Sequence, residues 1–125
     1  MSKSTTNPLM LLAAARAATG VVALVLPGRF TRVWVGAPEL PPRTVPITRG
    51  FAVREVSLGL GLLLALRTRR YTKDWIAAAV LSDGVDVVST LCGPIGTSRK
   101  LAVALTGLAS VACGSAALLN GESSV

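Results

Sequence analysis

The residues that could carry chemistry in this chain are five ionisable side chains inside otherwise apolar segments. Asp83 and Asp86 lie three residues apart in the stretch LSDGVDVVST. Arg16 interrupts an earlier apolar run, and Arg54 and Glu55 are neighbours near the start of another. An isolated Arg or Asp at the centre of a membrane-spanning helix costs about 2.5–3.5 kcal/mol, so five isolated charges would cost well over about 10 kcal/mol. These side chains must therefore pair, face an aqueous cavity or be neutralised.

The aspartate pair raises the question of a metal site or a catalytic pair. Carboxylates at positions i and i+3 share a helix face and can hold a divalent cation, but such sites use more acidic groups than these runs supply. The chain has two cysteines and no histidine. This composition excludes a Cys/His zinc cluster, a histidine haem ligand and a Ser-His or Cys-His pair. The sequence thus predicts no metal, no cofactor and no catalytic residue, and it favours a protein that is not an enzyme.

The composition indicates a membrane protein. Of 125 residues, 51% are hydrophobic and 15% are charged, whereas soluble domains carry about 25% charged residues. The mean hydropathy is +0.61. The net charge of +7 comes from cations that mostly flank the apolar runs, a pattern typical of loops beside membrane spans. No basic face is left for a phosphate backbone, so nucleic-acid binding is not expected.

Four apolar runs are long enough to span a bilayer. They cover residues 9–26, 50–66, 75–92 and 101–119. We therefore predict an all-α fold, an integral membrane four-helix bundle that forms a single transmembrane domain over residues 1–125. We expect it in the plasma membrane as a multi-pass protein in contact with membrane lipids.

Two alternatives compete with this prediction. A soluble four-helix bundle needs a wide polar face on each helix, but residues 101–119 offer only Thr106, Ser110 and Ser115 as polar side chains. The first run could instead be a cleaved signal peptide, but Arg16 would break its apolar core. We favour retained, membrane-spanning helices.

Residues 27–48 contain five prolines and are predicted to be a Pro-rich interfacial loop rather than a regular helix or strand. Phe30 and Trp34, beside Arg29 and Arg32, suit a short segment at the headgroup level with its aromatic side in lipid. An ordinary extended loop is the alternative.

The distribution of cations does not decide the membrane orientation. Four spans place both termini and the loop 67–74 on one side. That side has five cations, Lys3, Arg67, Arg69, Arg70 and Lys73, and the other has six, Arg29, Arg32, Arg43, Arg49, Arg99 and Lys100. The density of RTRR favours cytoplasmic termini.

Depth in the membrane predicts which charges pair. With about 1.5 Å of rise per residue, Arg16 and Asp83 both lie about 11–12 Å from the side of the termini, while Arg54, Glu55 and Asp86 lie near about 17–18 Å. We therefore predict that Arg16 pairs with Asp83 and Arg54 with Asp86, between the first three spans.

Small residues accompany these charges and suggest close helix contacts. Gly20 follows Arg16 by four residues, Gly50 and Gly61 share a helix face with Arg54, and Gly84 lies between the two aspartates. The fourth run has a predicted helix-packing face that contacts either another helix of the chain or a second subunit. Its members are Thr106, Ser110, Cys113 and Gly114.

The charge count leaves one carboxylate in excess, because Glu55, Asp83 and Asp86 face only two arginines. That carboxyl group is a candidate for carrying a proton at neutral pH. In the simpler interpretation, Arg54 and Glu55 reach the membrane interface and the remaining ion pair only joins helices. A polar intramembrane site formed by all five residues is the functional interpretation.

The run around Arg16, together with TRGFAVREVSLGLGLLLAL and WIAAAVLSDGVDVV, resembles short four-helix membrane proteins of actinobacteria. These belong to domain-of-unknown-function families loosely similar to the DoxX-like proteins. The resemblance extends over roughly residues 9–119. It implies the fold and a membrane location, and it implies no catalytic residue.

The sequence favours a small, non-catalytic membrane protein, an accessory or assembly subunit that could form a homo-oligomer or join a larger complex. The alternative is a proton-linked transporter, or a membrane protein that binds a small molecule or lipid between the first three spans. A membrane enzyme acting on lipid or quinone ranks third, because Asp and Arg can polarise a substrate.

Overall fold

The computed structural model describes residues 3–94 and 96–120, and these residues form five α-helices and no strand. The helices are α1 (Lys3–Val25), α2 (Pro27–Val35), α3 (Thr44–Thr68), α4 (Thr72–Cys92) and α5 (Thr97–Leu119). The all-α prediction is confirmed. Three predicted spans lie inside α3, α4 and α5, and the first matches α1 up to residue 25.

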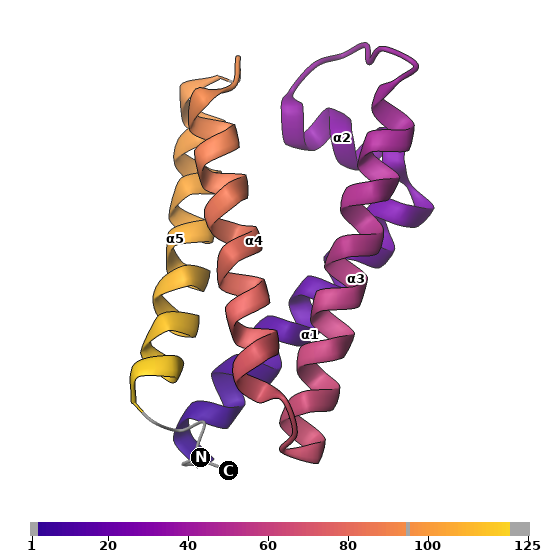
Figure 1. Cartoon of the computed structure of the whole chain (residues 1–125). Helices are drawn as coiled ribbons and strands as arrows, with labels where there is room; N and C mark the ends of the chain where they lie inside the picture. Colours follow the sequence, from indigo (N-terminus) through magenta and orange to yellow (C-terminus); the bar gives the residue numbers. More distant parts are fainter. Residues whose placement is uncertain (1–2, 95, 121–125) are drawn as a thin grey trace.

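The four long helices alternate in direction and form two antiparallel pairs, α1 with α3 and α4 with α5 (Figure 1). The start of α1, the end of α5 and the α3–α4 connection lie at the lower end in this view (Figure 1). The short helix α2 lies at the upper end, where the two pairs diverge (Figure 1). Ion pairs of Arg16 and Arg54 with Asp83 and Asp86 link the α1/α3 pair to α4.

Two glycines allow α1 and α3 to touch backbone to backbone. A Cβ atom on Gly59 would lie 2.6 Å from the amide nitrogen of Ala17, and one on Gly20 would lie 2.7 Å from the carbonyl oxygen of Ala52. These separations are below van der Waals contact, so only glycine fits at either position. The sequence identified Gly20 correctly and did not identify Gly59.

The other predicted close approaches are wrong. A Cβ atom on Gly50 or Gly84 would meet no atom within 4 Å. Gly61 is close to another part of the chain, but its neighbour is the indole ring of Trp75 rather than a helix backbone. Small residues at helical spacing therefore did not distinguish the contact face of α3 from its other faces.

The predicted loop over residues 27–48 is largely helical, which corrects the sequence analysis. Pro27 begins α2 and Pro46 is the third residue of α3, and these first-turn positions have no helical acceptor for the N–H that proline lacks. The hydroxyl groups of Thr31 in α2 and Thr48 in α3 lie 2.5 Å apart and are buried. Residues 36–43 alone connect these two helices.

The aromatic side of α2 contacts α3 as well as the outside of the protein, whereas the sequence suggested contact with lipid. Phe30 stacks on Trp34 and on Phe51 of α3, with ring centroids 5.6 and 5.7 Å apart. Near the C-terminal end of α2, the carbonyl oxygen of Trp34 accepts a hydrogen bond from Nη1 of Arg99 on α5 at 3.2 Å. The helix α2 therefore connects the α1/α3 pair to α5.

The buried apolar core lies at the lower end of the molecule. It consists of Leu9, Ala13, Leu62, Leu66, Ile76 and Ala117, contributed by all four long helices. Above this core, α1, α3 and α4 each contribute a buried charged side chain, from Arg16, Glu55 and Asp83. The core thus closes the space between the two helix pairs at one end only.

The small-residue face of α5 packs largely against its own neighbour, α4. Gly114 is buried, and a Cβ atom there would be closest to Val80 and Ile76. Cys113 packs against the apolar core. Thr106 and Ser110, the other predicted members, line a cavity described below. Two of the four predicted residues, Cys113 and Gly114, therefore pack within the same chain.

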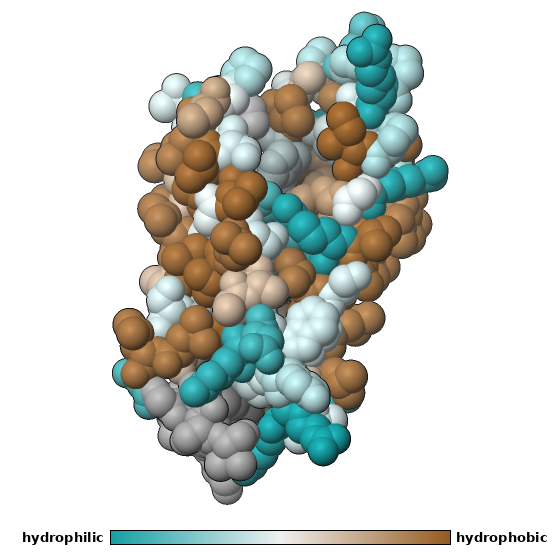
Figure 2. Space-filling model, viewed as in Figure 1, coloured by the Kyte–Doolittle hydropathy of each residue, from teal (hydrophilic) through white to brown (hydrophobic). Residues whose placement is uncertain are grey.

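Three of the long helices are long and apolar enough to cross a membrane, over Pro8–Val25, Thr72–Cys92 and Thr97–Leu119. The helix α3 is not among them. Any stretch of 18 residues within it contains Arg54, Glu55 and either Arg49 or Arg67, and three charges are too many for a candidate span. Large apolar side chains cover much of the outer surface, and hydrophilic residues gather at mid-height between two hydrophobic masses (Figure 2).

Candidate functional site

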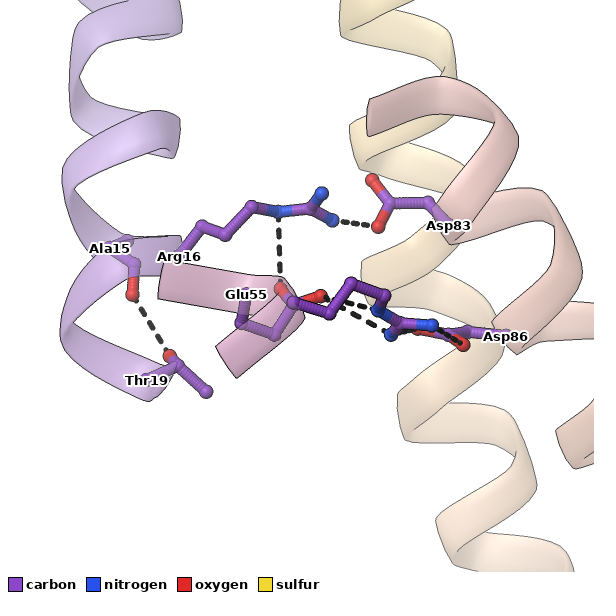
Figure 3. A network of polar contacts seen from close by, with 7 residues as sticks. Ala15, Arg16, Thr19, Glu55, Asp83 and Asp86 are labelled. Carbon is purple, nitrogen blue, oxygen red and sulfur yellow. Dashed lines mark hydrogen bonds and ion pairs between the residues drawn. The ribbon is translucent and has the colours of Figure 1, made fainter. Parts of the chain in front are cut away.

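Arg16 lies between two carboxylates contributed by different helices. Its Nε is 3.2 Å from Oε2 of Glu55 on α3, and its Nη2 donates a hydrogen bond to Oδ1 of Asp83 on α4 (Figure 3). All three side chains are about nine-tenths buried, with 9%, 7% and 10% of their surfaces exposed. This arrangement joins α1, α3 and α4 through one guanidinium group.

Arg54 forms the second half of the network and is more exposed. Its Nη1 donates to Oδ1 of Asp86 at 3.0 Å, and its Nη2 donates to Oδ2 of the same carboxylate, so the pair is bidentate. Its Nε and Nη2 also approach Oε1 of Glu55, at 3.3 and 3.2 Å. The guanidinium carbon lies 5.0 Å from the ring centroid of Phe51, within the range of a cation–π contact.

The two ion pairs predicted from membrane depth, Arg16 with Asp83 and Arg54 with Asp86, are both present. Glu55 contacts both arginines, which the depths of the residues did not predict. The suggestion that Glu55 extends to the membrane interface is wrong, because its side chain is 7% exposed. The five residues form one alternating series: Asp83, Arg16, Glu55, Arg54, Asp86.

A cavity of about 220 Å³ lies beside this network, between the two helix pairs. Its walls include Arg16, Glu55, Asp83 and Asp86, but Arg54 is not on its wall. Three carboxylates and one guanidinium therefore face the cavity. Because no side chain fills the space beside Asp86, a ligand or water molecules could reach that carboxylate.

The remaining cavity wall combines hydroxyl groups with apolar and aromatic side chains. Thr19 and Thr106 donate their hydroxyl protons to the carbonyl oxygens of Ala15 and Ala102, at 2.9 and 2.8 Å. Their oxygen lone pairs remain available as acceptors. The apolar part of the wall comes from Leu12, Trp34, Phe51, Val87, Val103 and Gly107, and Ser110 completes it.

The sequence analysis did not find the aromatic part of this wall. Trp34 is distant in sequence from every charged member of the site, and its segment suits either an interfacial position or an extended loop. Phe51 precedes Arg54 by three residues and so shares a helix face with it. That spacing is a signal that could have placed Phe51 beside the network.

A second and much smaller cavity, of about 10 Å³, lies between the network and the apolar core. Arg16 and Asp83 line it, together with Ser110 and apolar residues. The Nη1 atom of Arg16 is buried without a hydrogen-bond partner in the described chain, and it points away from Glu55 and Asp86 (Figure 3). A space of this size accommodates about one water molecule.

The carboxylates of the network do not form a metal centre. Among the described residues, no group of three or more His, Cys, Asp or Glu side chains is arranged to hold a metal ion. The guanidinium groups between the carboxylates occupy the positions that a cation would take. The geometry supports binding through charge, hydrogen bonds and aromatic contact.

Comparisons with known proteins add no further constraint. The resemblance to short four-helix membrane proteins, noted from the sequence, stays a prediction. No family model matches the chain, and no curated protein and no solved structure matches it either.

Proposed function

We propose that the protein is a multi-pass protein of the plasma membrane that binds a small molecule in the cavity between its two helix pairs. In this proposal α1, α3, α4 and α5 cross the bilayer, and α2 lies at the membrane interface. The observation that carries the binding function is the open cavity of about 220 Å³ beside Asp86, whose wall includes the buried ion network.

The outer surface supports the membrane location. Large apolar side chains are exposed on every long helix, including Leu11, Leu64, Leu81 and Leu105 at 72%, 63%, 71% and 61%. Contiguous exposed apolar surface of this kind is rare on soluble monomers. In lipid the same side chains need no further cover.

The span of α3 depends on its ion pairs. Its two central charges, Arg54 and Glu55, contact each other and residues of α1 and α4. Charged side chains inside membrane proteins usually face the protein interior and pair. Among the exposed positions of α3 near this level, Val53 and Leu60 are apolar and Ser57 carries a hydroxyl group. These features allow α3 to cross the bilayer beside α1 despite its lower hydropathy.

The size and lining of the cavity support binding. An engineered apolar cavity of about 150 Å³ binds benzene, and pockets for drug-sized ligands are about 300–1,000 Å³. The cavity thus suits a ligand of one ring or a short chain. Few polar groups in a mostly apolar pocket are the usual arrangement for recognising such a ligand.

Accessibility to a thiol reagent tests the cavity. In a background in which Cys92 and Cys113 are replaced by Ser and Ala, we expect Ser110→Cys to react with a small methanethiosulfonate, because Ser110 lines the cavity. Ala117→Cys on the same helix should stay unmodified, because Ala117 is 2% exposed in the core. Mass spectrometry of the detergent-solubilised protein measures both. Equal protection of the two thiols would contradict the proposal.

A second candidate function is an accessory or assembly subunit, and the surface of α5 favours it. Of the residues of α5, only Gly114 and Ala117 are buried within the described chain. The rest of its surface could contact a second copy or another membrane protein. Native mass spectrometry from detergent should then detect a stable oligomer or complex. A strictly monomeric species without partners would count against this function and leave the binding cavity unaffected.

A further inference from the structure

We infer that the ligand of the cavity is a small organic cation, an ammonium group attached to an apolar body. This inference rests on the proposed binding function and adds the charge and chemical class of the ligand. It follows from three properties of the wall: its formal charge, its surplus of hydrogen-bond acceptors and its aromatic side chains.

The charge of the wall is negative. Glu55, Asp83 and Asp86 line the cavity, and Arg16 is the only cationic side chain on the wall. The second guanidinium, from Arg54, lies behind this wall and is already held by Asp86 and Glu55. The whole network has three carboxylates and two guanidinium groups, so a monovalent cation would balance it. A ligand anion would add to the excess negative charge in a poorly screened site.

The carboxylates and the threonine hydroxyl groups of the wall offer acceptors. The hydroxyl protons of Thr19 and Thr106 are already donated to backbone carbonyl oxygens. The Nε and Nη2 donors of Arg16 are directed to carboxylates. Asp86, with 33% of its side chain exposed, is the carboxylate that a ligand reaches most readily. An ammonium group can donate to the lone pairs of Asp86 that remain beside its contacts with Arg54, and to the hydroxyl oxygens of Thr19 and Thr106.

Aromatic and aliphatic side chains form another part of the wall. Trp34 and Phe51, whose ring centroids are 6.2 Å apart, face the same cavity as Asp86. The faces of aromatic rings attract cations, most strongly when the site is desolvated. Val87 and Val103 can contact the apolar body of the ligand. A cation with one aromatic ring combines these interactions within about 220 Å³.

Three matched probes test the inference: 2-phenylethylammonium, 2-phenylethanol and 3-phenylpropanoate. Each has one ring and a short chain, and they differ in charge. Trp75→Phe leaves Trp34 as the single tryptophan of the chain, so quenching of its fluorescence in a nonionic detergent reports binding. We expect the ammonium probe to bind at least about tenfold more tightly than the alcohol, the equivalent of one desolvated cation–π contact, and the carboxylate to bind most weakly.

Two variants test the assignment to this cavity. Asp86→Asn should reduce the affinity for the ammonium probe to that for the alcohol, whereas Glu39→Gln, which changes an exposed carboxylate outside the cavity, should not. If Asp86→Asn does not fold, Thr106→Val removes one acceptor and should weaken ammonium binding more than alcohol binding, because a hydrogen bond from a charged donor is the stronger one. Equal binding of the ammonium probe and the alcohol, tighter binding of the carboxylate, or no binding of any probe would overturn the inference.

These outcomes are distinguishable from failure of the cavity itself. If Ser110→Cys reacts with the thiol reagent but the probes do not discriminate by charge, the binding function stands and the cationic ligand is wrong. If Ser110→Cys is protected as fully as Ala117→Cys, both proposals fail.

Discussion

Arg16→Met is expected to destabilise the protein by about 3–5 kcal/mol, the usual effect of removing one partner from a buried ion pair. The substitution leaves Glu55 and Asp83 without the cation that contacts both of them. Met fills a similar volume, so the loss measures charge rather than packing. Reversible unfolding in mixed micelles, followed by tryptophan fluorescence, gives the free energy of unfolding.

The matched control is Arg67→Met, which removes an exposed arginine from α3 and should change the free energy of unfolding little. A combined variant with Arg16→Met, Glu55→Gln and Asp83→Asn should recover most of the loss, because buried ionic groups can often be replaced by neutral ones. Equal stability of Arg16→Met and Arg67→Met would show that the network does not hold the helices together.

Gly59→Ala is expected to destabilise the protein by about 1–3 kcal/mol, the range for overpacking a close contact. The added methyl group would lie 2.6 Å from the amide nitrogen and 2.9 Å from the Cα of Ala17. Both atoms belong to a helix backbone, so no side-chain rotation relieves the overlap, and α1 must move away from α3. The same unfolding assay measures the change.

Gly84→Ala is the control for this prediction, because it makes the same substitution within a helix where a Cβ meets nothing within 4 Å. It should leave the stability unchanged or raise it by up to about 1 kcal/mol through helix propensity. Opposite signs for the two variants are therefore expected. A similar loss for both would mean that the close contact at Gly59 does not determine the effect.

The ion pairs could be predicted because few arrangements satisfy buried charges. Arg16 with Asp83 and Arg54 with Asp86 follow from the depth of each residue, given that unpaired charges are costly in lipid. Depth alone does not define the angle around a helix axis. Glu55 could therefore not be placed between the two arginines until the contact face of α3 was known.

Other features depended on information that a single sequence lacks. The prolines of residues 27–48 were interpreted as helix breakers, but Pro27 and Pro46 lie in first turns, where proline is tolerated. The contact glycine on α3, Gly59, could not be distinguished from Gly61, because each lies between two leucines. The cavity arises from the divergence of two helix pairs, which no local pattern encodes.

The position of Glu55 also bears on how the chain is made. Synthesis proceeds from the N-terminus, so α1 and α3 are complete before α4. The contact between Arg16 and Glu55 needs only these two helices, and it neutralises one charge on each as they meet. Arg54 already has Glu55 beside it, but its bidentate partner Asp86 arrives later with α4. Each arginine thus has Glu55 as a first partner and gains its aspartate when α4 follows. Under the proposed membrane location, α3, the least apolar long helix, would enter the bilayer as a hairpin with α1.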